Sequence, residues 1–300
     1  MARSGAGENL KGADRKRHFF QLLFMALFNG YVAGFVKGKI FTGKTKNLCV
    51  PVLNCHSCPG ALGACPVGSL QRVLSGSSRF SFYVLGTMML FGLLLGRLVC
   101  GFLCPFGFLQ DLLHKIPVKK LELPKRADRA ARWLKYAVLL IMVVLLPLLY
   151  RDEFGTGITF FCAYLCPAGT LEAGLPLLAA NPELKLMVGS QFYWKLAVLI
   201  LLVLWSVFTY RPFCRYLCPL GAFYGLFNRF SLFQYQFEKE KCTGCGACAR
   251  ACKMKIDVTE NVNSMECIRC GRCLAACPTE AITRKKIFAR QSTGKQGETV

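Results

Sequence analysis

Long apolar runs alternate along the chain with shorter connections that are rich in basic residues and cysteines. The runs cover residues 19–36, 80–99, 133–150 and 192–210. A helix rises about 1.5 Å per residue, so runs of this length are long enough to cross about 30 Å of hydrocarbon. The pattern predicts an α-helical membrane protein with four transmembrane helices. A cleaved signal peptide is the alternative interpretation of the first run.

The composition agrees with a membrane protein, because 54% of the residues are hydrophobic and 18% are charged. The net charge of +22 is also typical of proteins that bind nucleic acid. Here, however, the basic residues lie beside the apolar runs, where the positive-inside rule places them. We therefore expect membrane lipid, and no nucleic acid, as a partner of these charges.

The basic residues also predict an orientation. Arg15, Lys16 and Arg17 precede the first run, and residues 115–132 carry seven further Lys and Arg residues. The positive-inside rule places both segments in the cytoplasm, and an even number of spans returns the C-terminus there. The loop between the first two runs disagrees, since it is basic and contains no acid. We expect a multi-pass protein of the inner (cytoplasmic) membrane, in which residues 115–132 help to dock an acidic redox partner.

Cysteines dominate the sequence beyond residue 235. Two runs with the spacing C-x2-C-x2-C-x3-C follow each other, which is the spacing of two [4Fe-4S] clusters in which the fourth cysteine of each run binds the other cluster. The first predicted ligand set is Cys242, Cys245, Cys248 and Cys277, and the second is Cys252, Cys267, Cys270 and Cys273. Structural zinc sites and disulfides are the alternatives.

These two runs resemble the bacterial two-cluster ferredoxins, with Lys253 where that family often has proline. The resemblance implies a small α+β ferredoxin-like domain over residues 235–288. The predicted order is then a basic N-terminus (1–18), a transmembrane domain (19–234), the ferredoxin domain and a polar tail (289–300).

The pattern C-P-x-G occurs four times in the membrane part, each time after a different apolar run. Proline ends a helix and glycine permits a sharp turn, so each copy is expected to fold back along the membrane interface. The motif cysteines are Cys65, Cys104, Cys166 and Cys218. Three copies carry a second cysteine four residues earlier, namely Cys100, Cys162 and Cys214, and the first copy has Cys49, Cys55 and Cys58 instead.

Alternating spans place the second and fourth copies on one side of the membrane and the first and third on the other. The inner side then collects Cys100, Cys104, Cys214 and Cys218, which is the donor set that a cubane cluster needs. The outer side collects six candidates, of which Cys65, Cys162 and Cys166 are expected ligands with Cys58 or Cys55 as the fourth. The alternatives are buried free cysteines, a disulfide or zinc on the outer face.

The combination of C-x3-C-P motifs with a two-cluster ferredoxin resembles the membrane iron-sulfur proteins of the NapH, NosR and MauN group. That resemblance implies electron transfer, with a quinol-oxidising role as one possibility. The group carries two such motifs, so the motif at Cys162 and the cysteines from Cys49 to Cys65 are departures from its pattern.

The function predicted from these features is a relay of single electrons between a cytoplasmic redox protein, or a reductase or dehydrogenase subunit, and a membrane quinone or external acceptor. No catalytic residue is predicted. Asp111 and His114 are candidates for contact with quinone, since an acid and an imidazole near the membrane face manage protons. The alternative is a membrane-bound redox sensor or a maturation factor for a partner metalloenzyme.

Overall fold

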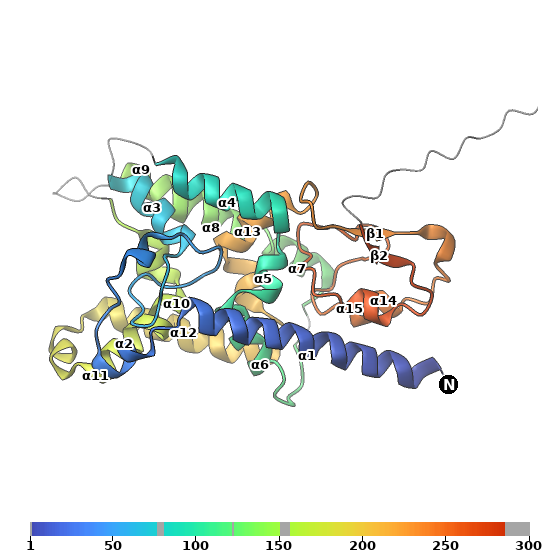
Figure 1. The fold of residues 1–300 in the computed structure, drawn as a ribbon, viewed down its shortest axis with the longest axis horizontal. Helices are drawn as coiled ribbons and strands as arrows, with labels where there is room; N and C mark the ends of the chain where they lie inside the picture. Colours follow the sequence, from blue (N-terminus) through green and yellow to red (C-terminus); the bar gives the residue numbers. More distant parts are fainter. Residues whose placement is uncertain (1, 77–80, 122, 151–156, 286–300) are drawn as a thin grey trace, which may run out of the picture.

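The protein is described by a computed structural model that covers residues 2–76, 81–121, 123–150 and 157–285. The described chain is mostly helical, as predicted, and a small domain near the C-terminus lies at one end of the helical part (Figure 1). The predicted polar tail, residues 289–300, lies outside the described residues.

The helical part begins with a long helix, α1 (Ala2–Phe28), which runs along the molecule. The elements that follow it up to the C-terminal domain are α2 (Val32–Lys37), α3 (Pro66–Gly76), α4 (Phe82–Leu95), α5 (Leu98–Phe102), α6 (Pro105–Leu113), α7 (Lys125–Ala131), α8 (Leu134–Val138), α9 (Leu146–Leu149), α10 (Pro167–Gly169), α11 (Leu175–Ala180), α12 (Ser190–Phe208) and α13 (Pro219–Phe227). Short 3-10 helices cover Lys44–Asn47 and Pro182–Met187, and π-helical turns cover Leu139–Leu145, Phe161–Leu165, Thr170–Gly174 and Phe213–Leu217.

Two of the four predicted spans form helices that are long and apolar enough to cross a membrane. These are α12 and the segment Lys125–Leu149, in which α7, α8, a π-helical turn and α9 follow one another. By length and composition alone, these helices are weak evidence for a membrane protein.

The first two predicted spans differ from the structure. The run at residues 19–36 breaks where α1 ends at Phe28, and the chain turns at Gly30 before α2. The run at residues 80–99 contains α4, which has 14 residues and ends at Leu95, where Gly96 follows with a positive φ angle (+54°). Such a conformation stops a helix. Within the described residues, four helices of full membrane length are therefore not observed.

The helices from the four predicted spans nevertheless run between the same two ends of the molecule in alternating directions. Near the C-terminal domain, Asp14 of α1 pairs with Arg272, and the Leu95 carbonyl of α4 accepts a hydrogen bond from Arg269. At the far end, the Phe28 carbonyl accepts a hydrogen bond from the Leu62 amide. We call the end that carries the C-terminal domain the inner end and the opposite end the outer end.

The C-terminal domain has the α+β fold that was predicted for it. Strand β1 (Tyr235–Phe237) pairs antiparallel with β2 (Ile282–Arg284), and helices α14 (Ala247–Ala251) and α15 (Arg272–Ala276) lie between them in sequence. A 3-10 turn at Lys239–Lys241 precedes the first cysteine. Gly246 and Gly271 adopt positive φ angles at the starts of α14 and α15, which glycine does without strain.

Candidate metal centres

The structure brings each predicted ferredoxin ligand set around one cavity. Cys242, Cys245, Cys248 and Cys277 line the first cavity, and the second is lined by Cys252, Cys267, Cys270 and Cys273. Burial raises the pKa of the Cys267 thiol to about 12, so metal binding there must displace a proton.

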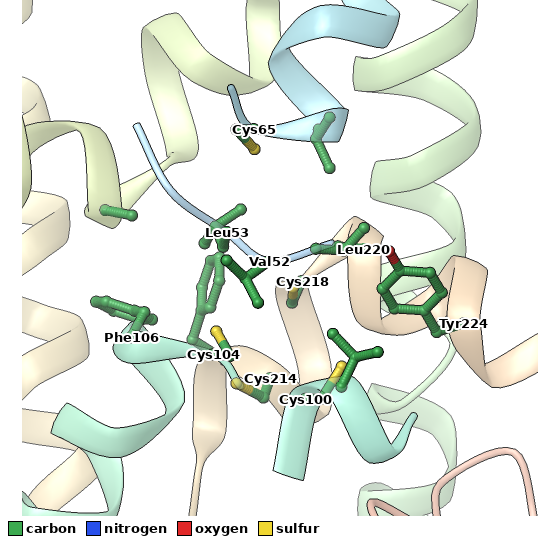
Figure 2. Packing of buried hydrophobic residues seen from close by; sticks show 14 of the residues in the cluster. Val52, Leu53, Cys65, Cys100, Cys104, Phe106, Cys214, Cys218, Leu220 and Tyr224 are labelled. Carbon is green, nitrogen blue, oxygen red and sulfur yellow. The ribbon is translucent and has the colours of Figure 1, made fainter. Parts of the chain in front are cut away.

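The second and fourth C-P-x-G copies come together in the hydrophobic core at the inner end. Cys100 and Cys104 come from the α5–α6 region, and Cys214 and Cys218 come from the turn before α13. Figure 2 shows the four sulfur atoms facing one another, and all four residues are buried. We call this group the inner site, and its four thiols fit the donor set of a [4Fe-4S] cluster.

A buried glutamine on α6 holds two parts of the inner site together. Gln110 Nε2 lies 3.1 Å from Cys214 Sγ and donates a hydrogen bond to it. The Gln110 Oε1 atom accepts a hydrogen bond from the Phe213 amide at 3.2 Å. The second motif therefore positions a ligand of the fourth. Gln110 lies beyond the C-P-x-G motif and was not predicted.

Two fully buried arginines flank the inner site. Arg211 donates to the Cys100 carbonyl at 2.6 Å, and Arg97 donates to the Cys214 carbonyl at 3.0 Å. Their side chains also lie against the motif glycines, since a Cβ at Gly107 or Gly221 would lie 3.3 Å from Arg211 or Arg97, respectively. These cations would offset the negative charge that four thiolates bring into a buried site when a cluster is bound.

The inner site touches the loop that carries the second ferredoxin ligand set. A Cβ at Gly101 would overlap the Ile268 carbonyl oxygen, so only glycine allows the two backbones this approach. Arg97 bridges the same contact, because it donates to the Met265 carbonyl and to Glu266 Oε2 at 2.9 and 3.0 Å.

A buried ion group fixes the ferredoxin domain in this position. Lys135 Nζ lies 2.6 Å from Glu266 Oε2, next to the Arg97 guanidinium. Burial by itself would raise the pKa of the Glu266 carboxyl, but Arg97 and Lys135 hold that pKa below its usual value. Glu266 is therefore ionised at neutral pH and joins two cations of the helical part.

The first and third C-P-x-G copies meet closer to the outer end. Cys55, Cys65, Cys162 and Cys166 line one cavity of about 720 Å³, and we call these four residues the outer site. Gln71 occupies the position that Gln110 has in the inner site, six residues after the motif cysteine. Its Nε2 atom donates to Cys162 Sγ at 3.3 Å.

The other two outer candidates lie apart from this cavity. Cys58 is buried with its Sγ 3.6 Å from Asn29 Oδ1, and Cys49 pairs through its backbone with Ala64. All eighteen cysteines, which lie in the described residues, are free. Within those residues, no three His, Cys, Asp or Glu side chains are spaced to hold a single metal ion.

Asp111 and His114 do not form the proton-handling pair that their spacing suggested. Asp111 is buried and receives two hydrogen bonds from Arg211, and Arg17 lies 3.2 Å from its Oδ2 atom. These arginines hold the pKa of Asp111 far below its usual range, although burial alone would raise it. Burial, together with Lys120 and Lys253, lowers the pKa of His114 to about 4. At neutral pH, Asp111 is therefore a charged structural group and His114 is neutral.

Family models match the parts of the chain that build the inner site and the ferredoxin domain. A 4Fe-4S binding domain matches residues 80–124 and 192–235, which contain Cys100, Cys104, Cys214 and Cys218. A 4Fe-4S dicluster domain matches residues 234–290, which contain the eight ferredoxin cysteines. The cysteines of the outer site lie outside both matches.

Similar proteins are found in archaea and bacteria. An uncharacterized protein of Methanocaldococcus jannaschii is 31% identical over 235 residues, covering 76% of this chain and 89% of its own length. The methylamine utilization ferredoxin-type protein MauN of Paracoccus denitrificans is 31% identical, covering 64% of this chain and 62% of MauN.

The regulatory protein NosR of Stutzerimonas stutzeri is 30% identical over 182 residues, which are 58% of this chain and 22% of NosR. No solved structure matches the chain. The cluster-binding domains and these relatives confirm the resemblance inferred from the cysteine motifs. This chain belongs to the family of NapH-, NosR- and MauN-like iron-sulfur proteins.

Proposed function

We propose that the protein is a multi-pass membrane protein that relays single electrons between a cytoplasmic redox partner and a membrane quinone or an external acceptor. Iron-sulfur clusters supply one-electron redox chemistry when they are bound. The chain contributes the ligands of these clusters, their insulation from water and the contacts that set their order.

The contact between the inner site and the second ferredoxin ligand set carries this proposal. Gly101 lies between two inner ligands and touches the backbone of Ile268, which follows Cys267. Arg97 joins the Cys214 carbonyl to Glu266, the residue before Cys267. Two cluster sites held together by buried groups suit electron exchange within one chain.

The first ferredoxin ligand set lies at the solvent side of this series. Cys245 is exposed, whereas the cysteines of the inner site are buried. A soluble donor or acceptor therefore has access to the first ferredoxin site, and the relay continues through the second site to the inner site. The ferredoxin domain faces the cytoplasm in this proposal.

The exposed surface of the two apolar helices supports a membrane position. Leu140 and Leu201 are 64% and 66% exposed, so both helices present large apolar side chains outward. Trp133, Tyr193 and Trp194 are exposed near helix ends, and aromatic side chains of this kind are typical of membrane interfaces.

The relay is tested by adding one methyl group at the contact between the inner site and the ferredoxin domain, which forces the two apart. A Gly101→Ala variant must move Ile268 away, whereas Gly86→Ala is a matched control because a Cβ there meets nothing within 4 Å. After reduction of the ferredoxin clusters, rapid-freeze electron paramagnetic resonance should show slower reduction of the inner cluster in Gly101→Ala only. Equal rates in both variants, or no iron at the inner site of the native protein, would refute the relay.

The alternative is a redox sensor or maturation factor, and the name of the regulatory protein NosR favours it. A sensor changes its redox state once for each signal, whereas a relay turns over repeatedly. Sustained electron flow through the purified protein in vesicles, from a cytoplasmic donor to an added quinone, distinguishes the two functions.

A further inference from the structure

The outer site follows the same construction plan as the inner site. In each site, a glutamine six residues after a motif cysteine makes two hydrogen bonds with the partner motif. Gln71 donates to Cys162 Sγ and accepts from the Phe161 amide at 3.1 Å, as Gln110 does with Cys214 and the Phe213 amide. Cys162 and Cys214 also lie in equivalent π-helical turns, Phe161–Leu165 and Phe213–Leu217.

A second contact joins the segment of the third motif to the loop that carries Cys55. Glu172, six residues after Cys166, accepts a hydrogen bond from the Cys55 amide at 2.9 Å. The motif glycines face the thiols of the partner motif, because a Cβ at Gly68 would lie 3.6 Å from Cys162 Sγ and one at Gly169 would lie 3.7 Å from Cys55 Sγ. Cys55 is therefore built into the site, in contrast to Cys49 and Cys58.

The surroundings of the outer cavity suit an anionic group. Lys46, Arg72 and Lys195 line the cavity together with the four thiols. Gln71 is completely buried, so its side-chain amide makes its hydrogen bonds within the protein and not with water. Two cysteines from each of two re-entrant segments give a cubane cluster its four ligands.

We propose that Cys55, Cys65, Cys162 and Cys166 bind a further [4Fe-4S] cluster, with Gln71 as the hydrogen-bond donor that positions Cys162 and tunes the cluster. This site extends the proposed relay towards the outer end, but its binding of iron does not depend on that function. Figure 2 shows Val52 and Leu53 between Cys65 and the inner cysteines, and these residues belong to the same packed core.

The full-length protein, purified without oxygen, tests the ligand set. We expect about sixteen iron atoms per chain, four for each of four clusters. Alanine at Cys55, Cys65, Cys162 or Cys166 should remove about four irons and the same paramagnetic signal. Cys49→Ala and Cys58→Ala are matched controls from the same loop, and they should keep both.

Three results would overturn the outer cluster. These are a native iron content of about twelve that does not fall in Cys162→Ala, zinc in place of four irons, and an equal loss of iron in Cys58→Ala and Cys55→Ala. The signals of the inner and ferredoxin clusters report separately on the proposed relay, so its failure is distinguishable from failure of the outer site.

The role of Gln71 is tested without removing a ligand. Gln71→Glu keeps the acceptor for the Phe161 amide and replaces the donor to Cys162 with a carboxylate. The iron content should stay unchanged, and the reduction potential of one cluster should fall, since hydrogen bonds to sulfur favour the reduced state. A potential that does not change, or a shift that appears in the inner cluster, would exclude this role.

Discussion

At the scale of single residues, Gln110 donates a side-chain hydrogen bond to a cysteine sulfur of the inner site. Its amide donates to Cys214 Sγ at 3.1 Å while its carbonyl holds the Phe213 amide. A hydrogen bond to a ligand sulfur stabilises the more negative, reduced state of a cluster. The side chain is thus expected to affect the potential of the inner cluster as well as its geometry.

Replacing Gln110 should therefore lower that potential. One hydrogen bond contributes about 0.5–1.5 kcal/mol, which corresponds to about 20–65 mV for one electron, so Gln110→Leu should shift the inner cluster by this amount. A redox titration followed by electron paramagnetic resonance measures the shift. Gln71→Leu is the control, because Gln71 contacts Cys162 and not the inner site. An unchanged inner potential in Gln110→Leu would contradict the argument.

Glu266 gives a second prediction at this scale, on stability. It is the carboxylate that contacts both Arg97 and Lys135 in this buried group, so Glu266→Gln leaves both buried side chains without their charge partner. Loss of one partner from a buried ion group costs about 3–5 kcal/mol. We expect a lower unfolding temperature for Glu266→Gln in detergent. Adding Lys135→Met should restore part of the lost stability, because it removes the buried amine that has lost its partner. A double variant no more stable than Glu266→Gln would show that the unpaired Lys135 is not the cause.

Spacing and the alternation of the apolar runs predicted which cysteines lie together in the ferredoxin domain and at the inner site, but they left open whether Cys55 or Cys58 joins the outer site. Arg97 and Glu266 could not be found in this way, since their partners lie far away in sequence and a single buried charge leaves no periodic pattern. Gln71 and Gln110 did leave a signal. Both lie six residues after a C-P-x-G cysteine, and comparing the copies beyond the motif would have identified them.

At the scale of elements, hydropathy located the apolar runs but not the helices within them. The run that contains α4 was expected to continue to residue 99, yet Gly96 turns the chain and Arg97 enters the core. Both features serve the contact with the ferredoxin domain, which no local pattern reveals. The binding of clusters by the assigned cysteines stays a prediction.

The basic connection between α6 and α8 contains residues with two different roles. Lys120 donates hydrogen bonds to the carbonyls of His114, Ile116 and Val207, so it joins the ends of α6 and α12. Lys119, Lys125 and Arg126 are exposed. The docking role that was predicted for the whole segment is therefore a prediction for the exposed residues alone.

This division predicts opposite results for two sets of variants. Changing Lys119, Lys125 and Arg126 together to glutamine should weaken the salt dependence of electron transfer from an acidic flavodoxin and leave the unfolding temperature unchanged. Lys120→Met should reduce the free energy of unfolding by about 1–3 kcal/mol, because it leaves carbonyls without donors. The unfolding temperature should fall accordingly. If the triple variant retains the native salt dependence, these residues do not dock the donor.

At the scale of the whole molecule, the alternating helices order the sites along one axis. The ferredoxin domain lies at the inner end and the inner site touches it, whereas Cys65 of the outer site lies on the far side of Val52 and Leu53. The C-P-x-G segments fold back into the core, so the two motif sites share one hydrophobic cluster. Packed core residues, with Val52 and Leu53 among them, therefore lie between Cys65 and the inner site.

This arrangement predicts which lysines lie on each side of the membrane. Lys44 and Lys185 are exposed in connections at the outer end, and Lys241 is exposed in the ferredoxin domain. In sealed inside-out vesicles, a membrane-impermeant amine reagent should modify Lys241 and spare Lys44 and Lys185, as measured by mass spectrometry of the peptides. All three should react once detergent opens the vesicles. Modification of Lys44 together with Lys241 in sealed vesicles would place the basic first loop in the cytoplasm, and the relay would then end within the membrane instead of crossing it.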